Sequence, residues 1–110
     1  MAPKSQDVLQ GTLDLLVLRT LSLEPLHGYG IVQRLTQIVQ GAIRINAGSV
    51  FPALYRLERA GHLESAWRET ENRRRAKYYA LTRAGRHKLA EERRKWARAS
   101  LAIARVLEAT

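Results

Sequence analysis

The segment from Thr82 to Thr110 places the strongest constraint on how this chain can fold. Thr82 is expected to begin a helix that continues to the end of the chain. At about 1.5 Å per residue this helix is on the order of 40 Å long. A globule of 110 residues cannot cover a helix of that length. The helix must therefore project from the rest of the molecule and find a partner surface.

Apolar residues recur along this last helix with the period of a short coiled coil. Leu89, Trp96 and Ile103 are each separated by seven residues, and Ala99 and Val106 occupy intermediate positions. We therefore expect these five residues to form the interface of a homodimer. The alternative is that they pack against the rest of the same chain, which the length of the helix disfavours.

The first helix is expected to run from Val8 to Leu23 and to be apolar on nearly all of its sides. One stripe has the spacing of a helix face: Leu9, Leu13, Leu16 and Val17. Leu15 and Leu18 form a second stripe on another face. Because a small monomer cannot cover both stripes, we expect Leu15 and Leu18 to join the dimer interface. Pro25 ends the helix, since the residue before a proline disfavours helical geometry.

A second helix is expected over residues 29–39, after a turn at residues 26–28. Gly41 follows its end, where glycine is common because it adopts the left-handed conformation. The short run of residues 42–45 is expected to pair as a minor strand.

The third helix is expected over about residues 47–60, and Gly61 terminates it. Either Asn46 or Ser49 caps its first turn, since both side chains can accept a hydrogen bond from the backbone. Because of Pro52, the sequence does not decide at which residue the helix begins. It fits only if the helix begins late or opens with a distorted first turn.

Two strand-like runs, residues 63–68 and 76–81, flank a polar tip at residues 69–75. Three short helices followed by a two-stranded hairpin is the layout of a winged helix-turn-helix. We therefore expect a mostly α fold with a small β-hairpin (α+β). Residues 1–81 form the winged helix-turn-helix domain, and residues 82–110 form a dimerisation helix that belongs to the same structural unit.

The charge of the chain indicates a polyanionic partner. Lys and Arg number 19 against 10 Asp and Glu, which gives a net charge of +9. Four positive charges lie at the expected hairpin tip: Arg73, Arg74, Arg75 and Lys77. We expect this wing, over residues 69–77, to contact the DNA backbone or minor groove. The alternative is a solvated turn in which Glu69 and Glu71 offset the arginines.

The third helix has an outer face suited to the major groove of DNA. On a helical wheel five residues fall on this face: Ser49, Pro52, Tyr55, Arg56 and Arg59. Short polar side chains and arginine read base edges or hold phosphates. We therefore expect this helix to be the recognition helix of a sequence-specific DNA-binding protein. The alternative is an ordinary amphipathic helix whose outer face is only solvated.

Several segments, in this order along the chain, resemble the PadR family of transcriptional regulators. Residues 10–16 (QGTLDLL) and 25–31 (PLHGYGI) are similar to the start of that family. Residues 48–58 (GSVFPALYRLE) are similar to its recognition-helix motif. Residues 72–79 (NRRRAKYY) resemble its wing. One departure is Phe51, where the family commonly carries tyrosine, so any hydrogen bond from that hydroxyl to DNA is absent here.

The resemblance implies a cytoplasmic homodimer that binds a pseudo-palindromic operator in double-stranded DNA, usually as a repressor. It also implies release by a small-molecule effector, since members respond to phenolic or other aromatic compounds. Trp96 is the residue we expect to contact such an effector, by stacking a flat ligand between two subunits. The alternative is that Trp96 only packs in the dimer interface.

Other classes of function have little support in the sequence. No pair of acids has catalytic spacing, no Gly-rich phosphate loop is present, and His27, His62 and His87 are scattered. We therefore expect no enzyme activity, no cofactor and no metal site. Neither a signal peptide nor an apolar run of about 18 residues is present, so no membrane partner is expected. The remaining alternative is a winged helix that binds proteins without specific DNA binding.

Overall fold

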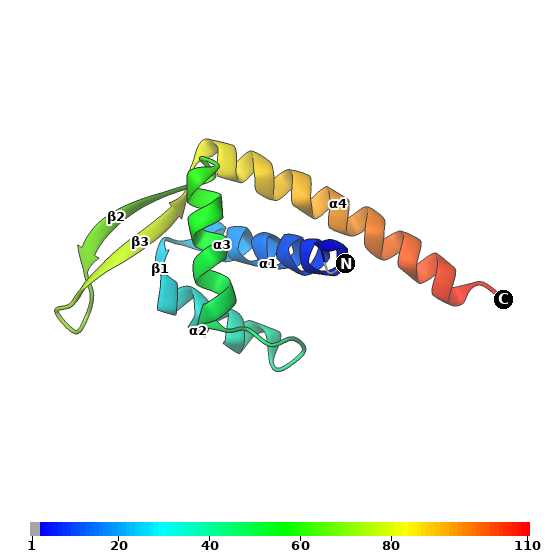
Figure 1. The fold of residues 1–110 in the computed structure, drawn as a ribbon, viewed down its shortest axis with the longest axis horizontal. Helices are drawn as coiled ribbons and strands as arrows, with labels where there is room; N and C mark the ends of the chain where they lie inside the picture. Colours follow the sequence, from blue (N-terminus) through cyan, green and yellow to red (C-terminus); the bar gives the residue numbers. More distant parts are fainter. Residues whose placement is uncertain (1–2) are drawn as a thin grey trace.

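The computed structural model describes the backbone of residues 3–110 and the side chains of residues 11–110. Its elements, in chain order, are α1 (Pro3–Leu23), β1 (Leu26–His27), α2 (Gly28–Val39), α3 (Ala47–Arg59), β2 (Leu63–Glu69), β3 (Arg75–Leu81) and α4 (Arg83–Glu108). The β2–β3 hairpin extends from one side of the helical body, and α4 extends from the other (Figure 1). The molecule is therefore elongated, with extents of 59 × 30 × 29 Å. The expected fold class, a winged helix-turn-helix with a long terminal helix, is confirmed.

The sheet has three antiparallel strands in the order β1-β3-β2. The long pair, β2 and β3, is in register from Leu63 opposite Leu81 to Glu69 opposite Arg75. The third strand, β1, pairs along the other edge of β3. The sequence analysis assigned β1 to a turn and expected residues 42–45 to be the minor strand, and both assignments are wrong. Residues 42–45 are irregular, because the open edge of β3 is already occupied by β1.

The core lies where α1, α2 and α3 meet the sheet and the first turns of α4. Two residues that the sequence analysis assigned to the dimer interface belong to this core. Leu18 is 0% exposed and Leu89 is 8% exposed within the single chain, so neither is available to a second subunit. Leu15 is only partly buried against the core. Leu9 lies outside the residues whose side chains the structure describes.

The start of α3, which the sequence left open, is at Ala47. Asn46 is the cap, and its side-chain oxygen accepts a hydrogen bond from the backbone N–H of Ser49 at 3.0 Å. Pro52 lies in the second turn of the helix. The carbonyl that an N–H at this position would reach belongs to Gly48, and that bond is absent because proline has no N–H.

The junction between the hairpin and α4 depends on Gly85. Thr82 caps α4, and its hydroxyl accepts a hydrogen bond from the Gly85 N–H at 3.0 Å. A Cβ on residue 85 would overlap the backbone carbonyl of His62. Glycine therefore allows the first turn of α4 to lie directly against the turn between α3 and β2, which fixes the direction in which α4 leaves the domain.

Candidate nucleic-acid interface

The side of α3 that faces away from the core is exposed. Four residues of α3 are buried on the opposite side: Val50, Ala53, Leu54 and Leu57. The exposed side carries three of the predicted contacts, Pro52, Tyr55 and Arg59, and Ser49 is exposed in the first turn. Arg59 Nη1 donates a hydrogen bond to Tyr55 Oη at 3.0 Å, and its guanidinium lies 5.6 Å from the centre of the Tyr55 ring. Tyr55 and Arg59 therefore form one polar unit on the outer face.

Arg56 lies on the flank of α3 that faces α1, not on the outer face that the sequence analysis predicted. Its Nη2 donates a hydrogen bond to Asp14 Oδ1 at 2.8 Å. Burial raises the pKa of Asp14 above its usual value, while the charge of Arg56 acts to lower it. Arg56 therefore ties α3 to α1 through a partly buried ion pair.

The tip of the wing is a closed turn that carries three exposed arginines. The Thr70 N–H donates to the Arg74 carbonyl at 2.7 Å, and the Arg73 N–H donates to the Thr70 carbonyl at 3.0 Å. Arg73 has a left-handed backbone conformation, with φ of 59°. The side chains of Arg73, Arg74 and Arg75 are exposed. The backbone of the turn thus holds three like charges close together at the end of the hairpin.

Lys77 is in the body of β3, away from the tip where the sequence analysis placed it. Its Nζ donates to Glu58 Oε1 at 3.0 Å, and the hydroxyl of Ser65 donates to Glu58 Oε2 at 2.5 Å. Both contacts hold the pKa of Glu58 below its usual value, the Ser65 bond most strongly. Glu58 therefore connects α3 to both strands of the hairpin and sets the position of the wing relative to the helix.

Replacing Glu58 with glutamine is expected to lower the free energy of unfolding by about 1 kcal/mol near neutral pH, because charge-assisted hydrogen bonds are lost. The folded-state pKa of Glu58 is lowered, so its stabilising effect is present above the ordinary value of 4.5 and disappears as the pH falls through the folded-state pKa. The difference between the two proteins should therefore shrink in acid. Urea unfolding at about pH 7 and about pH 3 measures it.

Glu64→Gln is the control for that experiment, because Glu64 is an exposed carboxylate on β2. It should leave the free energy of unfolding within about 0.5 kcal/mol of the parent. A Glu58→Gln difference that stays the same in acid would contradict a role for the ionised carboxylate.

A cleft of about 650 Å³ separates the wing from α3 and the start of α2. Its lining combines aromatic residues with cations: Tyr29, Phe51, Trp67, Tyr79, Arg74, Arg75 and Lys77. None of the described residues that line it has a carboxylate side chain. A second cleft, of about 630 Å³, includes Glu24 and Glu71 among its lining residues. Of these two clefts, the one between α3 and the wing is therefore better suited to a polyanion.

Comparison with known proteins assigns the chain to a family. The model of the family "Transcriptional regulator PadR-like family" matches residues 17–91, which include α2, α3 and the whole wing. The chain belongs to this family.

This PadR-like chain is similar to solved structures over nearly its whole length, as two of them illustrate. A PadR family transcriptional regulator from Eggerthella lenta is 30% identical, with a TM-score of 0.77, over 99% of this chain and 93% of that one. A PadR-like transcriptional regulator from Bacillus cereus is 25% identical, with a TM-score of 0.75, over 96% of each chain. An uncharacterised protein of Lysinibacillus sphaericus is 26% identical over 91 residues, 83% of this chain and 84% of that protein.

This PadR-like chain is therefore a DNA-binding transcriptional regulator and not an enzyme. Within the described part of the chain, no three His, Cys, Asp or Glu residues are grouped as metal ligands. No helix among those residues is long and apolar enough to cross a membrane.

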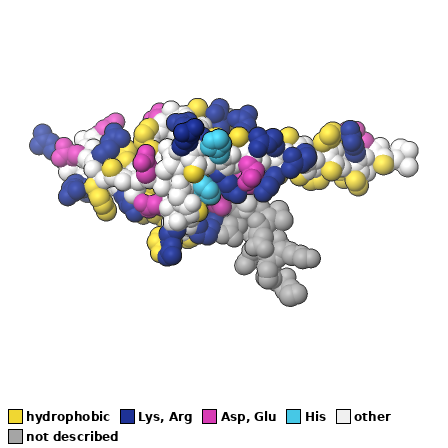
Figure 2. All heavy atoms as spheres, turned by 90° about the horizontal axis from the view of Figure 1, so that it is seen from above, with side chains coloured by type: hydrophobic (Ala, Val, Ile, Leu, Met, Phe, Trp, Pro, Cys, Tyr) yellow, Lys and Arg dark blue, Asp and Glu magenta, His cyan; other side chains and the backbone are white. Residues whose placement is uncertain are grey.

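The far half of α4 carries an uncovered apolar stripe. Leu89 lies on this stripe but packs against the chain's own core. Beyond it the same side of the helix continues through exposed residues: Trp96, Ala99, Ile103, Val106 and Leu107. In Figure 2 hydrophobic side chains gather along the end of α4 that projects from the rest of the molecule. The sequence analysis identified all of these residues except Leu107.

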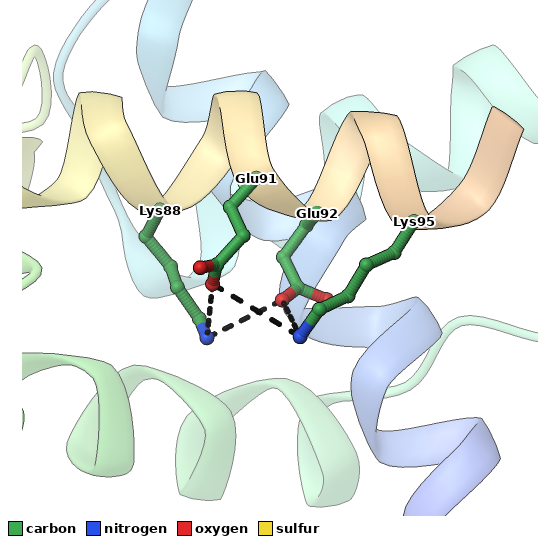
Figure 3. Close-up of polar contacts among 4 residues, drawn as sticks. All are labelled: Lys88, Glu91, Glu92 and Lys95. Atoms are coloured by element: carbon green, nitrogen blue, oxygen red, sulfur yellow. Dashed lines mark hydrogen bonds and ion pairs between the residues drawn. The ribbon is translucent and has the colours of Figure 1, made fainter. Parts of the chain in front are cut away.

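The middle of α4 carries a network of ion pairs between two lysines and two glutamates. Lys88 pairs with Glu91 at 3.2 Å and with Glu92 at 3.3 Å, and Lys95 pairs with the same two carboxylates at 4.0 and 3.4 Å. Figure 3 shows the four side chains extending to the same side of the helix, where the dashed contacts join them. The two positive and two negative charges of these four residues cancel, so the network itself adds nothing to the net charge of the chain.

Two residues of the interface were missed by reasoning from the sequence. Tyr29 was placed at the start of a helix without a role, yet its side chain is exposed beside α3. Phe51 was noted only for its missing hydroxyl, yet it lines the cleft. The sequence feature that could have identified Tyr29 is its position as an aromatic residue between Gly28 and Gly30 at the start of a helix. Sequence alone does not show that this turn lies against Phe51.

Proposed function

We propose that this PadR-like regulator is a homodimer that binds a pseudo-palindromic operator. In each subunit α3 enters the major groove, and the wing contacts the adjacent backbone or minor groove. The observation that supports this most directly is the cleft between the wing and the amino-terminal part of α3, where Arg74 and Arg75 of the wing share the lining with Phe51 of α3. A phosphate strand can occupy a cleft lined in this way without meeting a carboxylate.

Dimerisation is proposed to occur through the apolar stripe of α4, with a contribution from the exposed part of Leu15 on α1. A two-fold interface pairs each stripe with its own copy, so both are covered at once. The two α3 helices of such a dimer can face successive major grooves about one helical turn apart, roughly 34 Å. Sequence-specific binding then requires both half-sites.

Regulation is proposed to be repression in the cytoplasm, with operator occupancy relieved by a small-molecule effector. Trp96 is the candidate effector contact because it is large, aromatic, exposed in the single chain and part of the α4 stripe. A flat aromatic ligand could stack on it between the two subunits. Binding there would change the spacing of the two α3 helices and hence the fit to both half-sites.

The test is a titration of the purified protein with DNA from upstream of its own gene and with a scrambled fragment, at low and high salt. Tighter binding to the native fragment, weakening steeply with salt, is the expected result. Equal binding to both fragments, with no specific site found elsewhere in the genome by selection from fragmented DNA, would contradict sequence-specific recognition. No binding to DNA at low salt would favour a protein-interaction module.

A further inference from the structure

Three residues form an apolar surface at the amino-terminal end of α3, here called the aromatic corner: Tyr29, Phe51 and Pro52. Phe51 is 37% exposed and Tyr29 is 68% exposed. Their ring centroids are 5.2 Å apart and the rings are inclined by 63°, an edge-to-face contact. Pro52 is exposed next to them in the second turn of the helix. The surface therefore joins the start of α2 to the start of α3.

The ring of Phe51 is held in place by the backbone of α2. Gly28 is buried, and a Cβ on it would overlap the ring carbons of Phe51. The absence of a side chain at Gly28 creates the space that the ring fills. His27 holds this turn from the other side, because its Nδ1 accepts a hydrogen bond from the Gly30 N–H at 3.1 Å. Phe51 thus presents its exposed part in one fixed direction.

The chemistry of the aromatic corner limits what it can recognise. The side chains of Phe51 and Pro52 have no hydrogen-bonding group, and Pro52 also lacks a backbone N–H. Recognition of the usual donor and acceptor groups on base edges is therefore impossible at these two residues. The apolar group that base pairs display in the major groove is the C5-methyl of thymine, and phenylalanine is among the residues that contact it.

The charges around the corner point to DNA as its occupant. Phe51 and Tyr29 line the same cleft as Arg74, Arg75 and Lys77. An apolar surface bordered by cations suits a partner with apolar groups set within a polyanionic frame, which describes the major groove between its phosphate strands.

We propose that the aromatic corner reads a thymine in each operator half-site through the thymine C5-methyl group. This inference rests on the proposed function, because it assumes that α3 enters the major groove. It assigns sequence selectivity at this position to the apolar contact of Phe51, supported by Tyr29 and Pro52. The polar pair Tyr55 and Arg59 remains available to read or hold groups further along the helix.

The experiment replaces each thymine of the operator, one position at a time, with uracil, which keeps the base pairing and lacks the methyl group. Losing one buried methyl group should lower the affinity about fourfold when one half-site is changed. An operator with uracil at both symmetric positions should bind about 15-fold more weakly. One or two positions per half-site should show this loss with the parent protein. Thymines outside the half-sites should show none.

The same replacement measured with Phe51→Ala tests which residue makes the contact. Phe51→Ala should bind the operator equally well whether the sensitive position carries thymine or uracil. The effects of the uracil replacement and of the mutation on the binding free energy are then not additive. Phe51→Leu provides a second variant that keeps an apolar side chain should the alanine protein fail to fold. It should retain part of the uracil effect.

The outcomes separate this inference from the proposed function. Specific operator binding with no sensitivity to uracil would overturn the inference alone. So would an undiminished uracil effect in both Phe51→Ala and Phe51→Leu. A parent protein that prefers no DNA sequence would overturn the proposed function and this inference with it.

Discussion

Replacing Arg73, Arg74 and Arg75 together with alanine is expected to weaken operator binding by at least about 100-fold near 0.1 M salt. The reason is that the closed turn holds three exposed guanidinium groups at the end of the hairpin, and the proposed dimer presents two such turns. If each arginine neutralises one phosphate, six contacts disappear. The slope of log affinity against log salt should then become shallower by about 5. Titration at four or five salt concentrations measures both quantities.

A matched control removes the same charge elsewhere. Arg94, Arg98 and Arg105 are exposed on α4, on the side of the helix opposite the apolar stripe. Changing these three to alanine lowers the net charge equally without altering the wing. The salt slope should change by about 1 or less. Similar losses in both triple variants would mean that net charge, and not the wing, supplies the affinity. An unchanged slope in the wing variant would contradict phosphate contact by these arginines.

The elements of this fold follow largely from local signals in the sequence. The spacing of Val50, Leu54 and Leu57 identifies the buried side of α3, and the structure places all three in the core. Gly61 and Thr82 mark the end of α3 and the start of α4 through their backbone preferences. These signals depend on residues close together in the chain, so a single sequence reveals them.

The errors concern contacts between residues far apart in the chain. The wheel places Arg56 near the outer face of α3, but its partner Asp14 is 42 positions away on α1. Lys77 meets Glu58 in a similar way, across 19 positions. Periodicity places Leu18 and Leu89 on apolar faces of their helices. It does not show whether the same chain or a second subunit covers those faces. The structure shows that the same chain covers both.

The apolar stripe of α4 illustrates how one periodic pattern can serve two purposes. Its first residue, Leu89, completes the core of the domain, and this contact fixes how α4 leaves the body of the molecule. Its later residues extend beyond the reach of that core. The two regions lie on the same face of one helix. The near half packs against the domain, so a second subunit that covers the far half would have a fixed orientation relative to that domain. In the proposed dimer, packing at both ends of this stripe would therefore set the position of α3.

Replacing Ile103 with aspartate is expected to dissociate the proposed dimer. Ile103 is 55% exposed in the single chain and lies at the centre of the far half of the stripe. Loss of its apolar burial costs roughly 2 to 3 kcal/mol per subunit. The two-fold symmetry repeats that loss, and the two carboxylates are brought close together. The dimer dissociation constant should rise by about 1000-fold or more. Sedimentation equilibrium measures the change.

Leu101→Asp is the matched control, because Leu101 is on the same helix, is 51% exposed, and lies nearly opposite Ile103 around the helix axis. It introduces the same charge and should leave the dimer intact. The Ile103→Asp protein should also lose most of its affinity for the full operator, since a monomer contacts one half-site, while the helical content of the domain is retained. A dimer that survives Ile103→Asp, or one that Leu101→Asp disrupts equally, would exclude this side of α4 as the interface.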